Sequence, residues 1–313
     1  MKLRFKDKIN YILLCGVVYP LSLVPLRVLY LFADVTAWLA RCVVHYRRGT
    51  VRRNIEEAFP DRDTKELRRI EKGFYHWLAD YGVETLKLLT MSERTIRRRL
   101  VVENAEPVSR ALEQGRNVTL FLGHYCNWEW VSSLPVHFPE DAVCAQVYHP
   151  LHNKAMDRLF IRIRTHFHAN NEPMKEIMRF LIDCKRSGRP SVTGFIADQR
   201  PGWEAHLFVD FLNHDTAVFT GPERISKFLD SEVYYCHLSR PKRGRYVLKF
   251  VPITDTPKKE PDFSITRRYF DMLQANISEA PQYYLWSHKR WKRTREQYYE
   301  RWGDHKDEML AHL

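Results

Sequence analysis

The sequence predicts an α/β fold, with a mostly parallel central sheet flanked by helices and an apolar membrane-anchor helix at the N-terminus. Short β-branched runs alternate with segments of helical periodicity, a pattern typical of parallel sheets covered on both faces. The 313 residues are 44% hydrophobic and 28% charged, which is ordinary for a globular protein that buries a sizeable core. The mean hydropathy of −0.46 excludes a protein with many membrane spans.

The first element is an apolar segment without a charged residue from Ile9 to Leu26, which approaches the length of a membrane span. Pro20 and Pro25 interrupt it, and basic residues flank both ends, so loop charge does not define an orientation. A buried core helix and a cleaved signal peptide are the alternatives, although no small-x-small cleavage site follows. We expect residues 1–40 to form a membrane anchor, spanning or lying in the interface, and residues 41–313 to form one domain.

The elements of that domain can be placed in order. Apolar residues at three-to-four spacing predict a long helix over Asp61–Thr90. Five β-branched runs predict strands at Val118–Leu122, Val143–Val147, Ser191–Ile196, Val233–Leu238 and Tyr246–Val251. Further helical patterns occupy Asn153–His166, Pro173–Lys185 and Pro222–Leu229. Thr220 and Glu223 have the spacing of a capping box at the start of the last helix.

The segment Phe121–Trp130, with the sequence FLGHYCNWEW, contains the residues best suited to chemistry. His124 follows a strand through Gly123 and so lies at the carboxyl edge of the sheet, where ligands bind in open α/β folds. Glu129 comes five residues later, about 140° around a continuous helix, so we place His124 in the loop and Glu129 in the helix after it. There the carboxylate could hydrogen-bond one imidazole nitrogen and leave the other as a general base.

A histidine and a glutamate at this spacing are by themselves more often structural, but the surrounding residues resemble a known family. Gly-His-x-x-Asn-Trp-Glu resembles the H-x4-D/E motif of glycerolipid acyltransferases. It is more closely similar to the lipid A biosynthesis acyltransferases, the late lauroyl and myristoyl transferases of Gram-negative bacteria. Further blocks resemble that family in the same order: Tyr46–Pro60, Ala197–Pro201 with its Asp-Gln pair, Gly221–Ile225 and Leu285–Lys292.

The resemblance implies acyl transfer from a thioester, usually acyl carrier protein, to the hydroxyl of a 3-hydroxyacyl chain on a lipid A precursor. His124 would be the general base, Glu129 would hold its tautomer, and no covalent acyl-enzyme would form. Acyl coenzyme A is an alternative donor, and no cofactor or metal is expected. The implied location is the inner membrane, with the catalytic domain on the cytoplasmic side.

The resemblance also implies an arginine that stabilises the oxyanion. Arg158, Arg162 and Arg164 are the candidates, and the spacing from Asp157 and to Asp198 favours Arg164. Asp198 would orient this arginine or position the acceptor. The residues expected to bind substrate are Asn127, Arg158, Arg162, Gln199, Arg200, Glu223 and Arg224.

The net charge of +12, from 50 Lys and Arg against 38 Asp and Glu, calls for an anionic partner. The basic clusters Arg41–Arg53 and Lys289–Arg295 suit an anionic membrane, a phosphorylated lipid and an acidic carrier protein. The tryptophans among the second cluster also suit nucleic acid, which makes a non-enzymatic binding module the remote alternative. A lysophospholipid or another glycolipid is the alternative acceptor. We expect no nucleic acid partner.

Other chemistries find little support in the sequence. It has no P-loop, no GxGxxG fingerprint and no GxSxG elbow. Its 14 histidines lack the spacing of a metal helix, and its 6 scattered cysteines suggest free thiols in a reducing compartment. We do not expect Cys126, inside the histidine segment, to act as a nucleophile.

Overall fold

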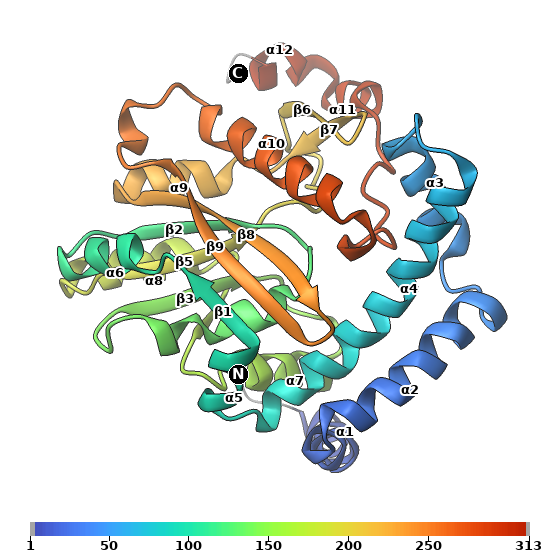
Figure 1. The fold of residues 1–313 in the computed structure, drawn as a ribbon. Helices are drawn as coiled ribbons and strands as arrows, with labels where there is room; N and C mark the ends of the chain where they lie inside the picture. Colours follow the sequence, from blue (N-terminus) through green and yellow to red (C-terminus); the bar gives the residue numbers. More distant parts are fainter. Residues whose placement is uncertain (1–3, 311–313) are drawn as a thin grey trace.

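The β-branched runs pair side by side in a seven-stranded sheet with the order β1-β9-β8-β2-β5-β3-β4 (Figure 1). The computed structural model describes residues 4–310. Strands β8, β2, β5, β3 and β4 are parallel, β9 is antiparallel to β8, and β1 is parallel to β9. The strands are β1 Leu100–Glu103, β2 Val118–Leu122, β3 Val143–Tyr148, β4 Asn170–Pro173, β5 Ser191–Ile196, β8 Glu232–Lys242 and β9 Arg245–Thr254. The mostly parallel sheet predicted from the sequence is therefore confirmed.

Helices cover both faces of this sheet, with α9 and α10 on one side and α5 and α7 on the other (Figure 1). All five residues of β2 are buried, as expected for a central strand covered on both faces. The helices of the domain are α3 Arg48–Ala58, α4 Thr64–Lys87, α5 Glu93–Arg99, α6 Glu106–Glu113, α7 Lys154–Arg164, α8 Ile177–Arg186, α9 Gly221–Leu229, α10 Ser264–Glu279, α11 Arg295–Trp302 and α12 Lys306–Leu310. A separate hairpin is formed by β6 Leu207–Phe211 and β7 His214–Val218.

The predicted capping box of α9 is wrong. Thr220 makes no side-chain cap hydrogen bond. Glu223 instead accepts hydrogen bonds from the backbone N–H of Thr266 at 2.9 Å and from its hydroxyl at 2.6 Å. The carboxylate of Glu223 thus satisfies a free N–H in the first turn of α10. In a capping box the same carboxylate would have bonded to the backbone at the start of its own helix, α9.

The apolar N-terminal segment forms two helices where the sequence predicted one. α1 spans Phe5–Leu23, and α2 spans Leu26–Trp38 before a short π-helical turn over Leu39–Val43. Among the described residues, no single helix is long and apolar enough to cross a membrane. The two helices meet the criterion only as a pair, bent by 116°. Pro25 at the break has no backbone N–H to continue the first helix, which accounts for the bend.

One face of this helix pair packs on the domain and the other does not. α1 contacts α4 and α7, and α2 contacts α4. The packed face of α2 carries Leu26, Leu29 and two small residues, Ala33 and Ala37. Large apolar side chains are exposed on the remaining surface, among them Phe5, Ile12, Leu13, Val17, Leu31, Phe32, Val35 and Trp38. The core-helix alternative therefore accounts for one face of the pair only.

Candidate active site

The register of the sheet brings His124 and Asp198 together. Leu122, the last residue of β2, pairs with Ile196, the last residue of β5. His124 and Asp198 each lie two residues beyond the end of their strand, so their side chains meet at the carboxyl edge of the sheet. His124 Nδ1 lies 2.6 Å from Asp198 Oδ1, and the His124 backbone N–H donates to Oδ2 at 3.1 Å. A carboxylate only accepts hydrogen bonds, so Nδ1 carries the proton and Nε2 keeps its lone pair.

The second imidazole nitrogen faces Gln199. The side-chain amide nitrogen of Gln199 lies 3.0 Å from His124 Nε2 and donates a hydrogen bond to it. Burial on its own would raise the pKa of Asp198, but the interactions of the carboxylate with His124 outweigh burial and hold that pKa below the usual value. Asp198 therefore stays ionised and fixes the tautomer in which Nε2 can accept a proton.

Glu129 is not the partner of His124, which corrects the predicted dyad. It lies in the first turn of η3, a 3-10 helix over Trp128–His137, and is 2% exposed. Its two oxygens accept a bidentate pair of hydrogen bonds from Arg164, with Nε at 2.8 Å and Nη2 at 2.7 Å. Tyr81 donates a further hydrogen bond at 3.3 Å. Burial raises the pKa of Glu129, but Arg164 more than offsets this and leaves the pKa lowered.

The three candidate arginines of α7 point in different directions. Arg164 lines the cavity beside His124. Arg162 lies with its guanidinium over the ring of Tyr19 in α1, 6.0 Å from the centroid. Arg158 is exposed to solvent. Helical spacing separates these side chains around α7, and only Arg164 of the three reaches the site.

A cavity of about 790 Å³ opens beside His124. Most of its lining is apolar and comes from β2, β3 and β5 together with η3, α8 and α9, including Leu120, Leu134, Val147, Val192, Ile177 and Ile225. Polar side chains also line it, among them those of His124, Glu129, Arg164, Gln199 and Arg200. A mostly apolar cavity with a few polar groups suits a substrate that has a fatty chain and a reactive head.

Gln199 and Arg200 are the predicted binding residues that reach this cavity. Nη1 of Arg200 is buried without a hydrogen-bond partner, so it can still receive an oxygen of a ligand.

The remaining predicted binding residues do not line the cavity. Asn127 is fully buried, donates to Glu84 Oε2 at 2.7 Å and accepts from the backbone N–H of Trp130 at 3.3 Å. Glu223 holds α10, as described above. Arg224 is exposed on α9. For Asn127 and Glu223 the structure shows structural hydrogen bonds in place of ligand contacts.

The C-terminal block backs the histidine loop, a contact that sequence reasoning missed. Cys126 N–H donates to Tyr283 O at 2.9 Å, and Leu285 N–H donates to His124 O at 3.2 Å. These bonds form an antiparallel bridge between Tyr125 and Tyr284. The loop needs this support because Cys126 has a φ of 53°, in the left-handed region that costs energy for a side chain other than glycine.

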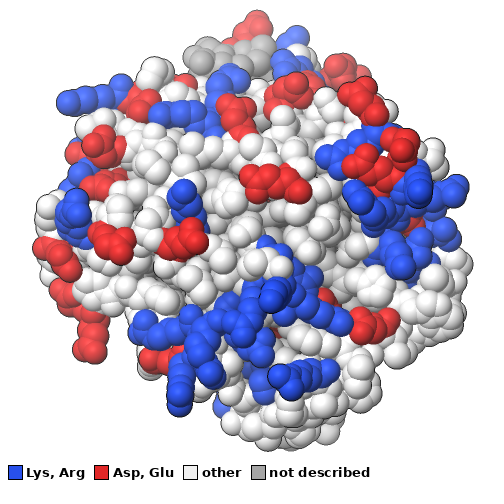
Figure 2. Space-filling model, viewed as in Figure 1, with Lys and Arg blue, Asp and Glu red and all other residues white. Residues whose placement is uncertain are grey.

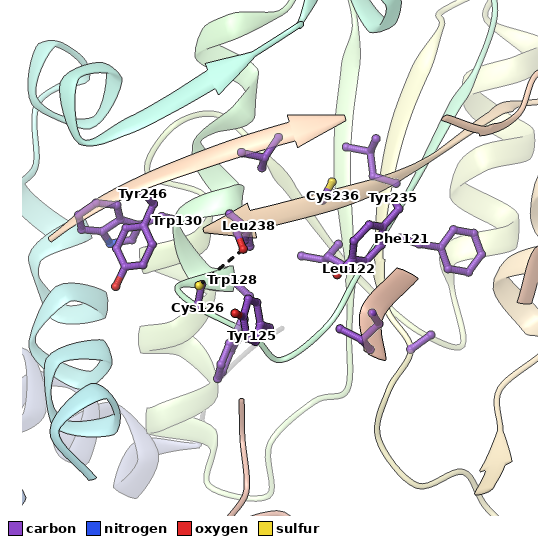
Figure 3. Packing of buried hydrophobic residues seen from close by; sticks show 14 of the residues in the cluster. Phe121, Leu122, Tyr125, Cys126, Trp128, Trp130, Tyr235, Cys236, Leu238 and Tyr246 are labelled. Carbon is purple, nitrogen blue, oxygen red and sulfur yellow. Dashed lines mark hydrogen bonds between the residues drawn. The ribbon is translucent and has the colours of Figure 1, made fainter. Parts of the chain in front are cut away.

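Cys126 is buried, and its sulfur points at the backbone carbonyl of Leu238, 3.8 Å away (Figure 3). Burial raises the pKa of the thiol well above its usual value. The thiolate required of a nucleophile is therefore disfavoured, in keeping with the expectation from the sequence.

Two further residues of the C-terminal block lie near Asp198. Arg290 is 3% exposed, donates to Ala217 O at 2.7 Å and adds a positive charge that helps to lower the pKa of Asp198. Burial lowers the pKa of His288 to about 4, so that imidazole is neutral at physiological pH. The Trp-x-His-x-Arg pattern of residues 286–290 was the signal in the sequence, but it gave no indication that these residues lie near Asp198.

The same block is not the open basic surface that its composition predicted. Arg290 is buried, Arg293 lies 3.9 Å over the ring of Trp203, and Arg295 makes a bidentate pair with Asp215. Lys289 and Lys292 are exposed. With three of its five cations engaged by other groups of the protein, this run is a poor surface for nucleic acid.

The model of the family described as bacterial lipid A biosynthesis acyltransferase matches residues 2–293. No curated protein matches the chain. The family match spans nearly the whole length and includes every residue of the site. The chain therefore belongs to the bacterial lipid A biosynthesis acyltransferases and is an enzyme that transfers acyl groups in lipopolysaccharide biosynthesis.

Proposed function

We propose that the protein transfers a fatty acyl chain from acyl carrier protein to the hydroxyl of a 3-hydroxyacyl chain on a lipid A precursor. The observation that carries the proposal is the 2.6 Å contact between His124 and Asp198 beside the apolar cavity. It places a base with a free lone pair where the head of an acyl chain would lie.

His124 is the general base in this proposal. The acceptor hydroxyl replaces the Gln199 amide at Nε2 and gives up its proton as its oxygen bonds to the thioester carbonyl carbon. The tetrahedral oxyanion then collapses, the C–S bond breaks, and the imidazolium returns the proton to the departing thiolate. Asp198 stabilises the imidazolium between these steps. The reaction needs no cofactor beyond the thioester donor.

Arg164 is the group proposed to face the oxyanion. Its Nε and Nη2 are held by Glu129, so Nη1 is the nitrogen left to donate into the cavity. Glu129 is a positioning residue in this arrangement, since it fixes the plane of the guanidinium. A preorganised donor of this kind is typically worth roughly 3–4 kcal/mol to the transition state.

We propose that the protein lies at the inner membrane with its domain on the cytoplasmic side, and two features of the surface support contact with a membrane. The exposed apolar face of α1 and α2 adjoins a basic area over α5 and the β8–β9 turn, where Arg94, Arg97, Arg98, Lys242 and Arg245 are exposed (Figure 2). A second basic area lies over α3. Each cation near an anionic leaflet adds about 1 kcal/mol to attachment. We propose that these areas serve the leaflet and the acidic carrier protein.

Mass spectrometry of lipid A from cells with and without the gene tests the proposal. Cells that lack the gene should produce lipid A with one acyl chain fewer. The wild-type gene and the control variant Asp210→Asn, at an exposed position of β6, should restore the chain, and His124→Ala should not.

An unchanged acylation pattern would overturn the lipid A acceptor and favour a lysophospholipid or another glycolipid. Restoration by His124→Ala would overturn the role of the base. Purified protein offered the same acyl group on carrier protein and on coenzyme A identifies the donor, and a clear preference for coenzyme A would contradict this part of the proposal.

A further inference from the structure

Gly194 occupies an unusual place for a glycine, in the middle of the inner strand β5. It pairs with Leu120 of β2 on one side and with Gln146 of β3 on the other. Glycine weakens a strand interior, and its presence there often marks a close approach by a ligand or another backbone. Its backbone does not require glycine, because its φ lies outside the left-handed region.

Packing does not require glycine at this position either. A Cβ added to Gly194 would lie 3.8 Å from Ala145 O and 3.8 Å from Leu122 Cδ2, which are ordinary contact distances. Gly194 is nevertheless partly exposed, although both neighbouring strands are covered by other elements. It is exposed because the cavity beside His124 reaches it.

The cavity runs along β5, where Phe195 lines it from one face of the strand and Ile196, Gly194 and Val192 line it from the other. Alternate residues of a strand share a face, and Ile196, Gly194 and Val192 all line the cavity. Ile196 lies nearest to the histidine edge, Gly194 about 7 Å further in, and Val192 about 7 Å beyond that. At Gly194 the wall consists of backbone alone, so a side chain there would project across the space that leads to Val192.

We propose that Gly194 determines the acyl chain length that the enzyme accepts, because its missing side chain lets the chain pass from the level of Ile196 to that of Val192. This inference rests on the proposed function, in which the cavity holds the acyl chain of the donor. The inference assigns the selectivity for chain length to one position, whereas an apolar lining alone would distribute it over many residues.

Kinetics with acyl carrier protein thioesters of eight to sixteen carbons test the assignment. The variants Gly194→Ala, Gly194→Val and Gly194→Leu form a series of growing side chains. We expect the longest chain that the wild type accepts to lose about tenfold or more in kcat/KM with Gly194→Val, and the optimum to move to shorter chains along the series. The shortest thioesters should retain their rates within about threefold.

Thr193→Val is the matched control, because Thr193 faces the other side of the same strand and does not line the cavity. It should leave the length profile unchanged. Equal losses at every chain length in folded Gly194 variants, or an unchanged profile, would overturn the assignment. Gly194→Ala keeps the test valid if the larger variants do not fold.

Binding separates this inference from the proposed reaction. Thioether analogues, in which S-alkyl phosphopantetheine carries the same range of chains, cannot transfer an acyl group. Calorimetry should show that Gly194→Val weakens the long analogues and not the short ones. If the wild type binds these analogues but transfers no acyl chain, the proposed reaction fails while the assignment of Gly194 stands. If Gly194→Val binds all lengths as the wild type does, the assignment fails.

Discussion

At the scale of single residues, the two carboxylates of the site have separate tasks. Asp198 accepts hydrogen bonds from the ring and from the backbone N–H of His124, whereas Glu129 accepts hydrogen bonds from the guanidinium of Arg164. The proposed base and the proposed oxyanion donor are thus each held by their own buried acid. This division would let His124 gain and lose a proton without loss of the orientation of Arg164.

Asp198→Asn should lower kcat by about 10³–10⁴-fold, because an amide can no longer stabilise the imidazolium or enforce the tautomer with a free Nε2. Initial-rate assays with acyl carrier protein as donor measure the effect. Asp210→Asn, the same change at an exposed residue, should retain the wild-type rate. A rate for Asp198→Asn within a few fold of wild type would show that His124 does not depend on this carboxylate.

Glu129→Gln should destabilise the protein by roughly 3–5 kcal/mol, because it leaves the charge of Arg164 without its buried partner. Urea denaturation of the single variants and of Glu129→Gln combined with Arg164→Gln provides a double-mutant cycle. The double variant should lose much less than the sum of the two single losses. Strict additivity would contradict the ion pair.

At the scale of elements, the structure confirms much of the sequence prediction. β2 and β5 have the predicted ends, and α4 with the short turn after it ends at Thr90, as predicted. These elements follow local patterns of β-branched and apolar residues, which a single sequence displays directly.

The side-chain partners were harder to predict. Asp198 lies 74 residues after His124, and only the pairing of Leu122 with Ile196 brings them together. Strand register depends on the whole sheet and has no local signature. Glu129 was the nearby acid in the chain, but η3 directs it toward α7, so proximity in sequence was misleading.

Close packing of α10 against the loop after β2 explains the glycine before His124. A Cβ on Gly123 would lie 2.5 Å from Leu273 Cδ1 of α10. Gly123→Ala should therefore destabilise the protein by about 1–3 kcal/mol through overpacking and reduce activity by shifting the loop.

The companion change Leu273→Ala makes room for the new methyl group. Thermal unfolding and initial rates of the two single variants and the double variant measure the coupling. Gly123→Ala should cost less stability in the Leu273→Ala background than in the wild type, although Leu273→Ala itself leaves a cavity. An equal cost in both backgrounds would indicate that α10 does not impose the glycine.

At the scale of the whole molecule, α1 and α2 present large apolar side chains to the outside while their other face packs on the domain. An apolar surface of this kind, rimmed by cations, is typical of a membrane contact. The two helices are bent by 116° relative to each other, and in the described part of the chain no single helix is both long and apolar enough to cross a membrane.

Replacing Leu31, Phe32 and Trp38 together by Ser should strongly reduce binding to vesicles of phosphatidylethanolamine and phosphatidylglycerol. Each of these exposed side chains adds about 1.5–3 kcal/mol when it leaves water. Co-sedimentation measures the bound fraction. Phe228→Ser, at an exposed aromatic residue of α9, is the matched control and should bind as the wild type does. Undiminished binding of the triple variant would place the contact elsewhere on the surface.

The bridge between Tyr125 and Tyr284 sets an order of events during synthesis. Chains leave the ribosome N-terminus first at about 5–20 residues per second, so the helices α1 and α2 emerge long before the segment around Tyr284. About 160 residues separate His124 from its backbone partner Leu285, which corresponds to roughly 10–30 s of translation. The histidine loop lacks this support throughout that interval. The apolar helices of a nascent chain are therefore complete well before the histidine loop gains its backbone support from the C-terminal block.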